Sequence, residues 1–430
     1  MNEVPHKNFD KEEGTQGMLS PYCILDLTDE KGLICGQLLG SLGADVIKIE
    51  KPGGDPARNI GPFYHDIPHP EKSLFWFAFN TNKRGITLSI ETLDGQEIFK
   101  RLAKTADVVI ESFPPGYMDK LGLGYPELER INPGIVLTSI TPFGQAGPYK
   151  DFKASDLVCW AMGGALFTCG SSGKPPVLVS HVPQAFLQGS IDAAWAIVMA
   201  LYWRGISGEG QQIDASIQES VERCALVSHV MWRLTGRPFQ QSGSRYTVDP
   251  LRPELPSGTW EAKDGYVRHT IYTGEQGARM NSPVIEWMRK EEYADKYLIE
   301  LDWSKFGWDN LPAEEIKRIV ECYARFFKSK TKAELLDGAK ERNADVEPVY
   351  TIGEILTHPQ LEARDYWQKV KHSELGVTIT YPDGFCKPSH TVCRQWCRAP
   401  LIGEHNLEVY HEELGFSKEE LTNLKQAGII

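Results

Sequence analysis

Residues 22–50 read YCILDLTDEKGLICGQLLGSLGADVIKIE, and this segment contains the signals of a strand, a helix and a second strand in turn. The largely apolar run at 22–28 predicts the first strand. Apolar residues at helical spacing predict a helix over 32–42, and ADVIKIE at 44–50 predicts the second strand. Together they form a β-α-β unit, which is typical of a parallel sheet whose strands are joined by helices.

The same alternation continues toward residue 140. Further elements are predicted as an extended segment at 85–90, a helix at 94–106, a strand at 107–111, a short helix at 126–131 and a strand at 134–140. Because these strands are almost wholly apolar, both faces of the sheet are expected to be covered. The sequence therefore predicts an α/β fold with a parallel sheet.

The second half of the chain begins with helical patterns and then changes in composition. Helices are predicted over 157–167, 189–203 and 217–234, with a short strand at 212–215. A segment rich in polar residues, Gly and Pro at 236–256 predicts a linker. Beyond it, Asp264-Gly265 predicts a hairpin turn. Charged amphipathic helices follow at 283–298, 313–328 and 332–342, and the chain ends with a mixed segment from 346 that includes a helix at 418–426.

Charge and hydropathy exclude several classes of partner. The 46 Lys and Arg against 58 Asp and Glu give a formal net charge of −12, which disfavours nucleic acid as the main partner. The longest apolar run, at 193–202, is too short to span a bilayer and follows Asp192, so no membrane is expected. Residues 1–19 contain no apolar signal-peptide core. We expect a mobile tail on a cytoplasmic protein.

Well-known catalytic and cofactor motifs are not present. The nine cysteines include no CxxC pair, and the tightest group, Cys386, Cys393 and Cys397, indicates reduced thiols packed as small apolar groups rather than a metal site. The sequence contains no GxxxxGK[ST], HExxH or GxSxG motif. Glu50 ends the second strand, where an NAD-binding fold places an acid, but the glycines from Gly36 onward come too late to hold a pyrophosphate.

Several ordered blocks of the sequence carry a family resemblance that extends from Tyr22 to Ile430. The chain resembles the class III CoA-transferases, the family of formyl-CoA transferase, carnitine CoA-transferase and α-methylacyl-CoA racemase. The matching blocks are LLGSLGADVIKIEKPGGDPAR at 38–58, FNTNKRGITLSI at 79–90, ADVVIESFPPGYMDKLGLGYPELERINPGIVLTSITPFGQAGPY at 106–149, GEGQQIDASIQESV at 208–221 and APLIGEHN at 399–406.

This resemblance implies an architecture. In that family two subunits thread through one another like linked rings, and each has a Rossmann-like large domain and a smaller α+β domain inserted before the chain returns to the large one. The expected plan is a flexible tail at 1–20, the first part of the large domain at 21–235, a linker at 236–256, the small domain at 257–345 and the return at 346–430.

The resemblance also implies a coenzyme A site, because CoA is a substrate of these enzymes; no tightly bound cofactor is expected. CoA needs cations for its phosphates and an apolar slot for adenine. The positions where family members hold CoA are Lys51, Leu88, Ile90, Ser112, Phe113, Lys120 and Lys153 in this sequence. The family often has Asn at the position of Ser112 and Arg at that of Lys120. Without the resemblance, the same residues would be interpreted as solvated lysines and core side chains.

The resemblance makes the catalytic position the most informative one. Family transferases use one Asp, which attacks the donor thioester, forms a mixed anhydride and then an aspartyl-CoA thioester, and passes CoA to the acceptor carboxylate. In this sequence the region is PPVLVSHVPQAFLQGSIDAAW at 175–195, and the position of the nucleophile falls on Ala185. A shift of one residue gives Gln184 or Phe186. None of these side chains can attack a thioester, so no catalytic residue is expected here.

Two other acids are candidate substitutes for the missing nucleophile. Asp192 lies seven residues beyond Ala185, which is about 10 Å along a helix. Asp156 stands where transferases often carry an acid, and it is a candidate auxiliary residue, but it could equally cap a helix that begins at Leu157. Racemases have a His before their acid at that point, whereas this chain has Ser155, which argues against proton abstraction next to a thioester.

Three functional hypotheses follow. The first is a non-catalytic subunit of a heteromeric CoA-transferase, in which an Asp-bearing homologue supplies the nucleophile. Such a pairing is known for succinyl-CoA:benzylsuccinate CoA-transferase of anaerobic toluene degradation, where one subunit resembles this chain in lacking the Asp. The second is a self-sufficient homodimeric transferase that uses Asp156 or Asp192. The third is a catalytically inactive CoA-binding regulatory protein.

Overall fold

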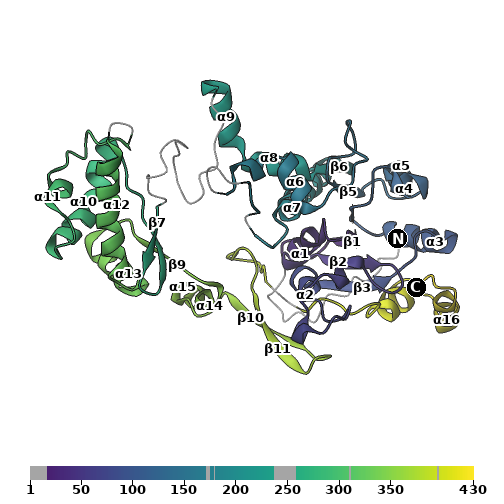
Figure 1. The fold of residues 1–430 in the computed structure, drawn as a ribbon. Coiled ribbons are helices and arrows are strands. Elements are labelled where there is room, and N and C mark those ends of the chain that lie inside the picture. Colours follow the sequence, from purple (N-terminus) through teal and green to yellow (C-terminus); the bar gives the residue numbers. More distant parts are fainter. Residues whose placement is uncertain (1–16, 171–174, 179, 237–257, 309–310, 395–396) are drawn as a thin grey trace. The chain divides into compact units, whose positions relative to one another are not determined.

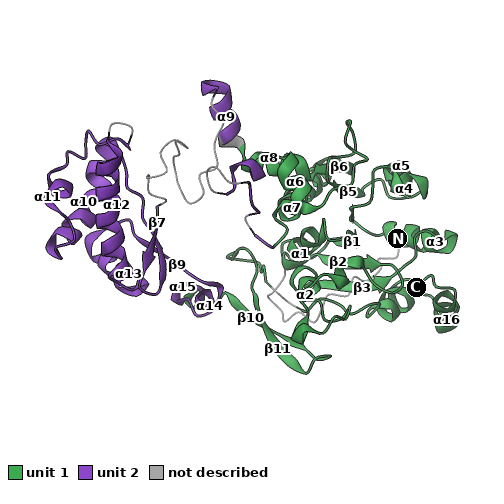
Figure 2. Cartoon of the chain, viewed as in Figure 1, with its two compact units in different colours: residues 1–165, 182–226, 362–430 green, residues 166–181, 227–361 purple. Residues whose placement is uncertain are grey.

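The structure is a computed structural model, and it describes residues 17–170, 175–178, 180–236, 258–308, 311–394 and 397–430. The chain forms two compact units (Figure 2). Unit 1 contains residues 1–165, 182–226 and 362–430, and unit 2 contains residues 166–181 and 227–361. Most of the linker and tail expected from the sequence lies outside the described residues.

Unit 1 contains a six-stranded parallel sheet in the order β3-β2-β1-β4-β5-β6 (Figure 1). This confirms the predicted α/β fold with a parallel sheet. The chain passes from β1 toward one edge and then returns to β4 on the other side of β1, so the strand order reverses between β1 and β4. The strands are β1 Cys23–Leu27, β2 Asp45–Glu50, β3 Lys83–Thr87, β4 Val108–Glu111, β5 Val136–Thr141 and β6 Gln211–Ser216.

Helices cover the two faces of this sheet. On one face Leu25, Val109 and Leu137 share a core with Phe99 and Leu102 of α3. On the other face lies α1, where a methyl group added at Gly36 would come 2.4 Å from the Asp26 carboxylate. The helices of unit 1 are α1 Leu33–Ser41, α2 Leu74–Phe79, α3 Leu93–Ala103, α4 Tyr117–Lys120, α5 Tyr125–Ile131, α6 Asp156–Met162, α7 Gln184–Ser207, α8 Ile217–Cys224 and α16 Lys418–Gln426, and β10 Trp367–His372 pairs with β11 Val377–Pro382.

Charged side chains are buried beneath the sheet. Asp26, Lys48 and Lys83 are all fully buried, and the Lys83 Nζ lies 2.8 Å from the Asp26 Oδ2. Burial by itself would raise the pKa of Asp26, but Lys83 and Lys48 together lower it below its usual value. The carboxylate is therefore ionised and compensated, as a buried charge requires.

Unit 2 has a small antiparallel sheet and an aromatic core. The strands β7 Thr259–Ala262, β8 Gly265–Arg268 and β9 Glu347–Val349 form the sheet, and the predicted Asp264-Gly265 turn joins the first two. Its helices are α10 Gly274–Lys290, α11 Lys296–Glu300, α12 Ala313–Lys328, α13 Lys332–Arg342 and α14 Ile352–Ile355, and the boundaries with unit 1 fall within α9 Leu226–Thr235 and α15 Pro359–Ala363. The core contains Trp260, Trp287, Tyr323, Phe326 and Phe327.

The boundaries of several helices differ from the sequence expectation. α7 begins at Gln184, whereas the predicted start was Gly189. Gly189 lies inside the helix and allows close packing against α8, since an added methyl group would lie 2.7 Å from Ile217. The predicted helix at 217–234 is divided at Ala225 into α8 and α9. The helix predicted at 283–298 is instead α10, because Pro283 lies inside that helix and not at its start, and α11 forms separately. The helix predicted at 157–167 ends at Met162 as α6. The first difference matters for the site, since it places Ala185 inside a helix.

Helix α7 is also long and apolar enough to cross a membrane by length and composition. Half of its most apolar stretch is buried within the structure, and Ala193, Ile197 and Leu201 are among the buried residues. A core helix of a soluble protein passes the same test, so one helix of this kind is weak evidence for a membrane span.

Candidate functional site

The candidate site lies at the carboxyl ends of β1 and β4, where the strand order reverses. Ligands of open α/β sheets bind at such a point. Here the Ser112 hydroxyl accepts a hydrogen bond from the Asp29 backbone N–H at 2.9 Å and donates one to the Asp29 Oδ1 at 2.8 Å. The Lys31 ammonium also pairs with Asp29. Ser112 therefore links the segments that follow the two strands.

Glu111 closes β4 next to this link. Its side chain is 4% exposed, and its Oε2 accepts a hydrogen bond from the Phe113 backbone N–H at 2.7 Å. Burial raises the pKa of Glu111 to about 7, although the Ser139 hydroxyl and the Phe113 N–H oppose that rise. Glu111 is not among the residues predicted from the sequence; the signal that could have indicated it is a carboxylate at the end of an otherwise apolar strand.

A series of contacts connects two of the predicted CoA-binding residues, Phe113 and Lys51. The Phe113 and Tyr117 rings lie 4.8 Å apart, and the Tyr117 hydroxyl donates to the Glu91 Oε1 at 2.9 Å. Glu91 in turn forms an ion pair with Lys51 at 2.6 Å. A continuous set of contacts thus connects the end of β4 to the residue that follows β2.

The remaining predicted residues are of two kinds. Leu88 and Ile90 are buried in the core against which Phe113 packs, so they form the floor beneath this group. Lys120 on α4 and Lys153 in the loop before α6 are exposed, and neither forms an ion pair with another residue that the structure describes. The two exposed lysines are free to meet an anion.

The amino terminus of α7 carries the predicted nucleophile position. Ala185 is in the first turn and fully buried, and the flanking residues are Gln184 and Phe186. The Asp156 Oδ1 accepts a hydrogen bond from the Phe186 backbone N–H at 3.0 Å. Burial raises the pKa of Asp156, although the backbone N–H groups of Phe186, Ala185 and Gln184 oppose that rise.

Asp156 does not cap its own helix, contrary to one alternative from the sequence. α6 begins at Asp156 itself, after Ser155, and the carboxylate reaches across to the first turn of α7 instead. A helix amino terminus favours a negative charge, since its first N–H groups have no partner within the helix. The anion at this helix end is therefore Asp156, from another part of the chain.

The other substitute acid is engaged elsewhere. The Asp192 Oδ2 lies 3.5 Å from the Arg223 guanidinium of α8, two turns along α7 from Ala185. The hydroxyl of Ser190, between them in sequence, donates to the Lys31 backbone carbonyl at 3.0 Å. This contact joins α7 to the segment that follows β1, and so to the candidate site.

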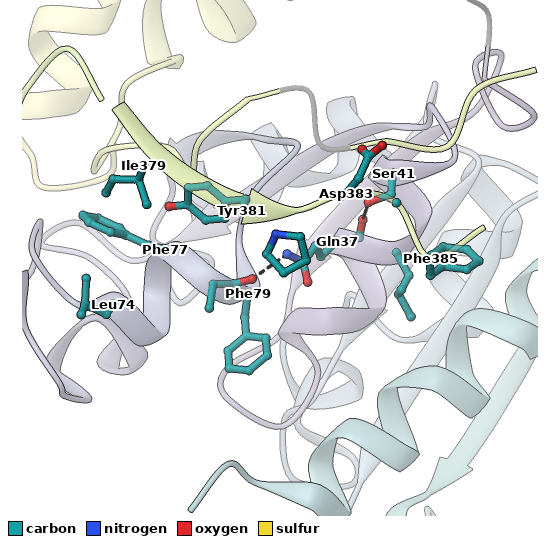
Figure 3. A pocket seen from close by; sticks show the side chains of 13 residues that line it. Gln37, Ser41, Leu74, Phe77, Phe79, Ile379, Tyr381, Asp383 and Phe385 are labelled. Carbon is teal, nitrogen blue, oxygen red and sulfur yellow. Dashed lines mark hydrogen bonds between the residues drawn. The ribbon is translucent and has the colours of Figure 1, made fainter. Parts of the chain in front are cut away.

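A separate cavity of about 430 Å³ lies between α1, α2 and β11 (Figure 3). It is lined mainly by apolar side chains, among them Leu74, Phe77, Ile379 and Tyr381. The Gln37 amide at its wall donates to the Ala78 carbonyl oxygen. The cavity lies at the carboxyl-terminal half of α1, whereas the candidate site adjoins the segment before that helix. None of the predicted CoA-binding residues lines the cavity. Within the described ranges no group of three or more His, Cys, Asp or Glu side chains is arranged to hold a metal ion.

Comparison with known proteins identifies relatives over nearly the whole chain. Residues 22–406 match the family described as CoA-transferase family III. The succinyl-CoA:(R)-benzylsuccinate CoA-transferase subunit BbsE of Thauera aromatica is 32% identical, over 96% of this chain and 98% of the relative. A formyl-CoA:oxalate CoA-transferase of Streptomyces avermitilis is 33% identical, over 95% of this chain and 98% of the relative. The crystal structure of a CAIB/BAIF family protein from Brucella suis is 25% identical, covers 93% of this chain and 100% of that chain, and superposes with a TM-score of 0.77.

Proposed function

The chain belongs to CoA-transferase family III, and we propose that it is the non-nucleophilic subunit of a heteromeric enzyme of that family. The proposed reaction moves CoA from succinyl-CoA to a carboxylic acid such as benzylsuccinate. The observation that carries the proposal is the first turn of α7, where Gln184, Ala185 and Phe186 offer no carboxylate. A methyl, amide or phenyl group cannot form an anhydride with an acyl group.

In this proposal the nucleophile comes from a homologous Asp-bearing chain. That carboxylate attacks the thioester of succinyl-CoA, which gives a mixed anhydride and CoA thiolate; the thiolate then attacks the aspartyl carbonyl, which gives an aspartyl-CoA thioester and releases succinate. The acceptor carboxylate attacks this thioester to form a second anhydride, and the CoA thiolate that is released attacks the acyl carbonyl of the acceptor, which gives the new acyl-CoA and frees the Asp. The relative BbsE is itself a subunit of a larger enzyme, and this supports a heteromer. The proposed assembly is cytoplasmic and interlocked.

An exposed apolar stripe on α7 supports a partner chain. Trp195, Met199, Tyr202 and Ile206 follow a spacing of four, three and four residues, which places them on one face of the helix. They are 66%, 55%, 67% and 62% exposed. Monomeric proteins rarely leave a continuous apolar surface of this kind uncovered. A second subunit would remove this face from water.

The proposed role of this chain in substrate binding is to hold CoA. Lys51, Lys120 and Lys153 would meet phosphate groups, with Ser112 and Phe113 at the entrance to the site and Leu88 and Ile90 beneath. In the free chain Glu91 already neutralises Lys51. A phosphate would therefore replace a carboxylate as the partner of that lysine.

One observation favours the homodimeric alternative. The Asp156 carboxylate lies within hydrogen-bond distance of the first turn of α7, so a carboxylate is present at this helix end although the helix does not supply it. Its bond to the Phe186 N–H would have to break before it could attack a thioester. For this reason we favour the heteromer.

The deciding experiment is native mass spectrometry of the protein isolated from its source, with succinyl-CoA transfer assayed on the same fraction. The proposal expects a complex with a second, Asp-bearing chain, and transfer activity in that complex only. Activity of a homodimer, accompanied by a hydroxylamine-sensitive enzyme adduct, would overturn it. Asp156→Asn and Asp192→Asn variants of such a homodimer would then identify the acid in use.

A further inference from the structure

Glu111 is the buried acid of the candidate site that the proposed function leaves without a role. It lies at the register position between Leu27 of β1 and Ser139 of β5, so a strand flanks it on each side. Its carboxylate turns back onto the chain and accepts the N–H of Phe113, two residues on. This bond closes a short turn directly after β4.

Residues of other segments also contact that turn. The Ser112 hydroxyl makes two hydrogen bonds to Asp29, and the Phe113 ring packs against Tyr117, which is joined through Glu91 to Lys51. The two residues inside the turn are both proposed CoA contacts. Their backbone geometry therefore depends on whether the Glu111 carboxylate keeps its bond to Phe113.

We infer that Glu111 is a positioning residue, which fixes the Ser112–Phe113 turn so that the turn can contact CoA. This inference rests on the proposed CoA site. Glu111 itself is not proposed to touch the substrate, because its side chain is buried behind the turn. It acts by accepting a hydrogen bond, and an ionised carboxylate is a stronger acceptor than a neutral one.

The surroundings of Glu111 place its titration near neutral pH. Its pKa is raised to about 7 mainly by burial; Lys31 lowers it and Asp29 raises it, both from the segment that follows β1. Ser139 from β5 lowers it further. Between pH 8 and pH 6 the carboxylate therefore takes up a proton, and its bond to the Phe113 N–H weakens.

The test compares the wild-type chain with Glu111→Gln and Glu111→Ala, each purified as the full chain together with any partner that copurifies. CoA binding is measured by calorimetry at pH 6, 7 and 8, and amide hydrogen exchange of the peptide that contains Phe113 is measured at the same pH values. Glu129→Gln, an exposed change on α5, is the control. Because a phosphate of CoA titrates in the same range, the informative quantity is the difference between variants at each pH.

Glu111→Ala is expected to weaken CoA binding about tenfold at pH 8 and to accelerate exchange at Phe113 by a similar factor. Glu111→Gln keeps an acceptor oxygen, so it should restore most of the affinity and remove the excess pH dependence seen in the wild type. If Glu111→Ala does not fold, the comparison of wild type with Glu111→Gln still tests the inference.

Two outcomes would overturn it, and they are distinguishable. The positioning role alone would be overturned if the wild type and Glu111→Gln bound CoA with the same pH dependence and, where Glu111→Ala folds, if that variant bound CoA as tightly as the wild type. Wild-type chain that does not bind CoA at any of these pH values would overturn the CoA site on this subunit, and the positioning role with it.

Discussion

Unit 1 buries ion pairs beneath its sheet, whereas unit 2 buries aromatic rings around a histidine. In unit 1 the Lys83 ammonium donates to Asp26, to the Leu33 carbonyl and to Asn80 at 2.7–2.9 Å. In unit 2 the His269 ring stacks on Tyr323 with centroids 5.4 Å apart, and its Nδ1 donates to the Asp345 carbonyl at 2.6 Å. The two interiors therefore respond to different perturbations.

The two buried lysines of unit 1 show how local this response is. Burial lowers the pKa of Lys83, and the adjacent ammonium of Lys48 lowers it further, although Asp26 opposes both. Burial would also lower the pKa of Lys48, but Asp26, Asp55 and Glu50 surround that lysine and raise its pKa. Unit 1 is thus sensitive to the loss of a charge, and unit 2 should be sensitive to the gain of one or to a change of volume.

The largest expected effect comes from removing a charge in unit 1. Asp26→Asn leaves Lys83 and Lys48 without their shared carboxylate, and should lower the free energy of unfolding by about 3–5 kcal/mol. Urea unfolding followed by circular dichroism measures this. The exposed change Glu129→Gln should leave the unfolding midpoint unchanged. Equal midpoints for Asp26→Asn and wild type would mean that the buried ion pairs do not organise unit 1.

The second effect is the gain of a charge in unit 2. Burial lowers the pKa of His269 to about 4, and its Nε2 has no hydrogen-bond partner among the described residues. Burial of the neutral His269 ring costs no stability above pH 6.5, where the ring is neutral in the unfolded chain as well. As the pH falls from 6.5 through 4, the unfolded chain takes up the proton first, and the free energy of unfolding falls by at most about 3 kcal/mol. Unfolding of unit 2, followed by tryptophan fluorescence, should lose stability in that window, and His269→Phe should flatten the loss. An equally steep loss in the variant would assign it to other groups.

A smaller effect tests volume in the aromatic core. A methyl group added at Gly338 would lie 2.2 Å from the Trp287 ring, so Gly338→Ala should destabilise unit 2 by about 1–3 kcal/mol. The matched control is Gly205→Ala in α7, where an added methyl meets nothing within 4 Å and should stabilise by about 0.5–1 kcal/mol. Thermal denaturation compares the two. Opposite signs are expected, and the same sign for both would contradict the packing argument.

The smallest effect concerns the anion at α7. Asp156→Ala removes the acceptor of the Phe186 N–H and should cost about 0.5–2 kcal/mol. Asp156→Asn keeps an acceptor and should cost less, because burial already disfavours the ionised form. In unit 2 the capping-box residue Thr331 offers a comparison, and Thr331→Ala should cost a similar amount. A melting temperature unchanged in Asp156→Ala would show that this carboxylate does not stabilise α7.

Local patterns in the sequence predicted much of the fold. The strand expected at 44–50 is Asp45–Glu50, and the Asp264-Gly265 turn joins β7 and β8 as expected. These features depend on neighbouring residues only, so alternation and turn chemistry suffice to detect them. The start of α7 could not be found in this way, because Gly189 serves a contact with Ile217, which is distant in sequence.

The candidate site was predictable to a lesser degree, for the same reason. The resemblance directed attention to Ser112 and Phe113, yet it gave no role to Glu111, whose pKa depends on burial and on Lys31, Asp29 and Ser139. Nor could the sequence indicate that Asp156 reaches the first turn of α7, since the two helices meet only in the folded chain. The roles of the predicted CoA-binding residues stay predictions.

The uncovered stripe on α7 has a consequence for the protein in the cell. If the proposed heteromer forms, a chain made before its partner would present Trp195, Tyr202 and Ile206 to other newly made proteins, and exposed apolar surface of this kind attracts chaperones and promotes aggregation. Its lifetime would then depend on the supply of the second subunit. Balanced synthesis of the two chains, more than the intrinsic stability of either, would set how much of the complex accumulates.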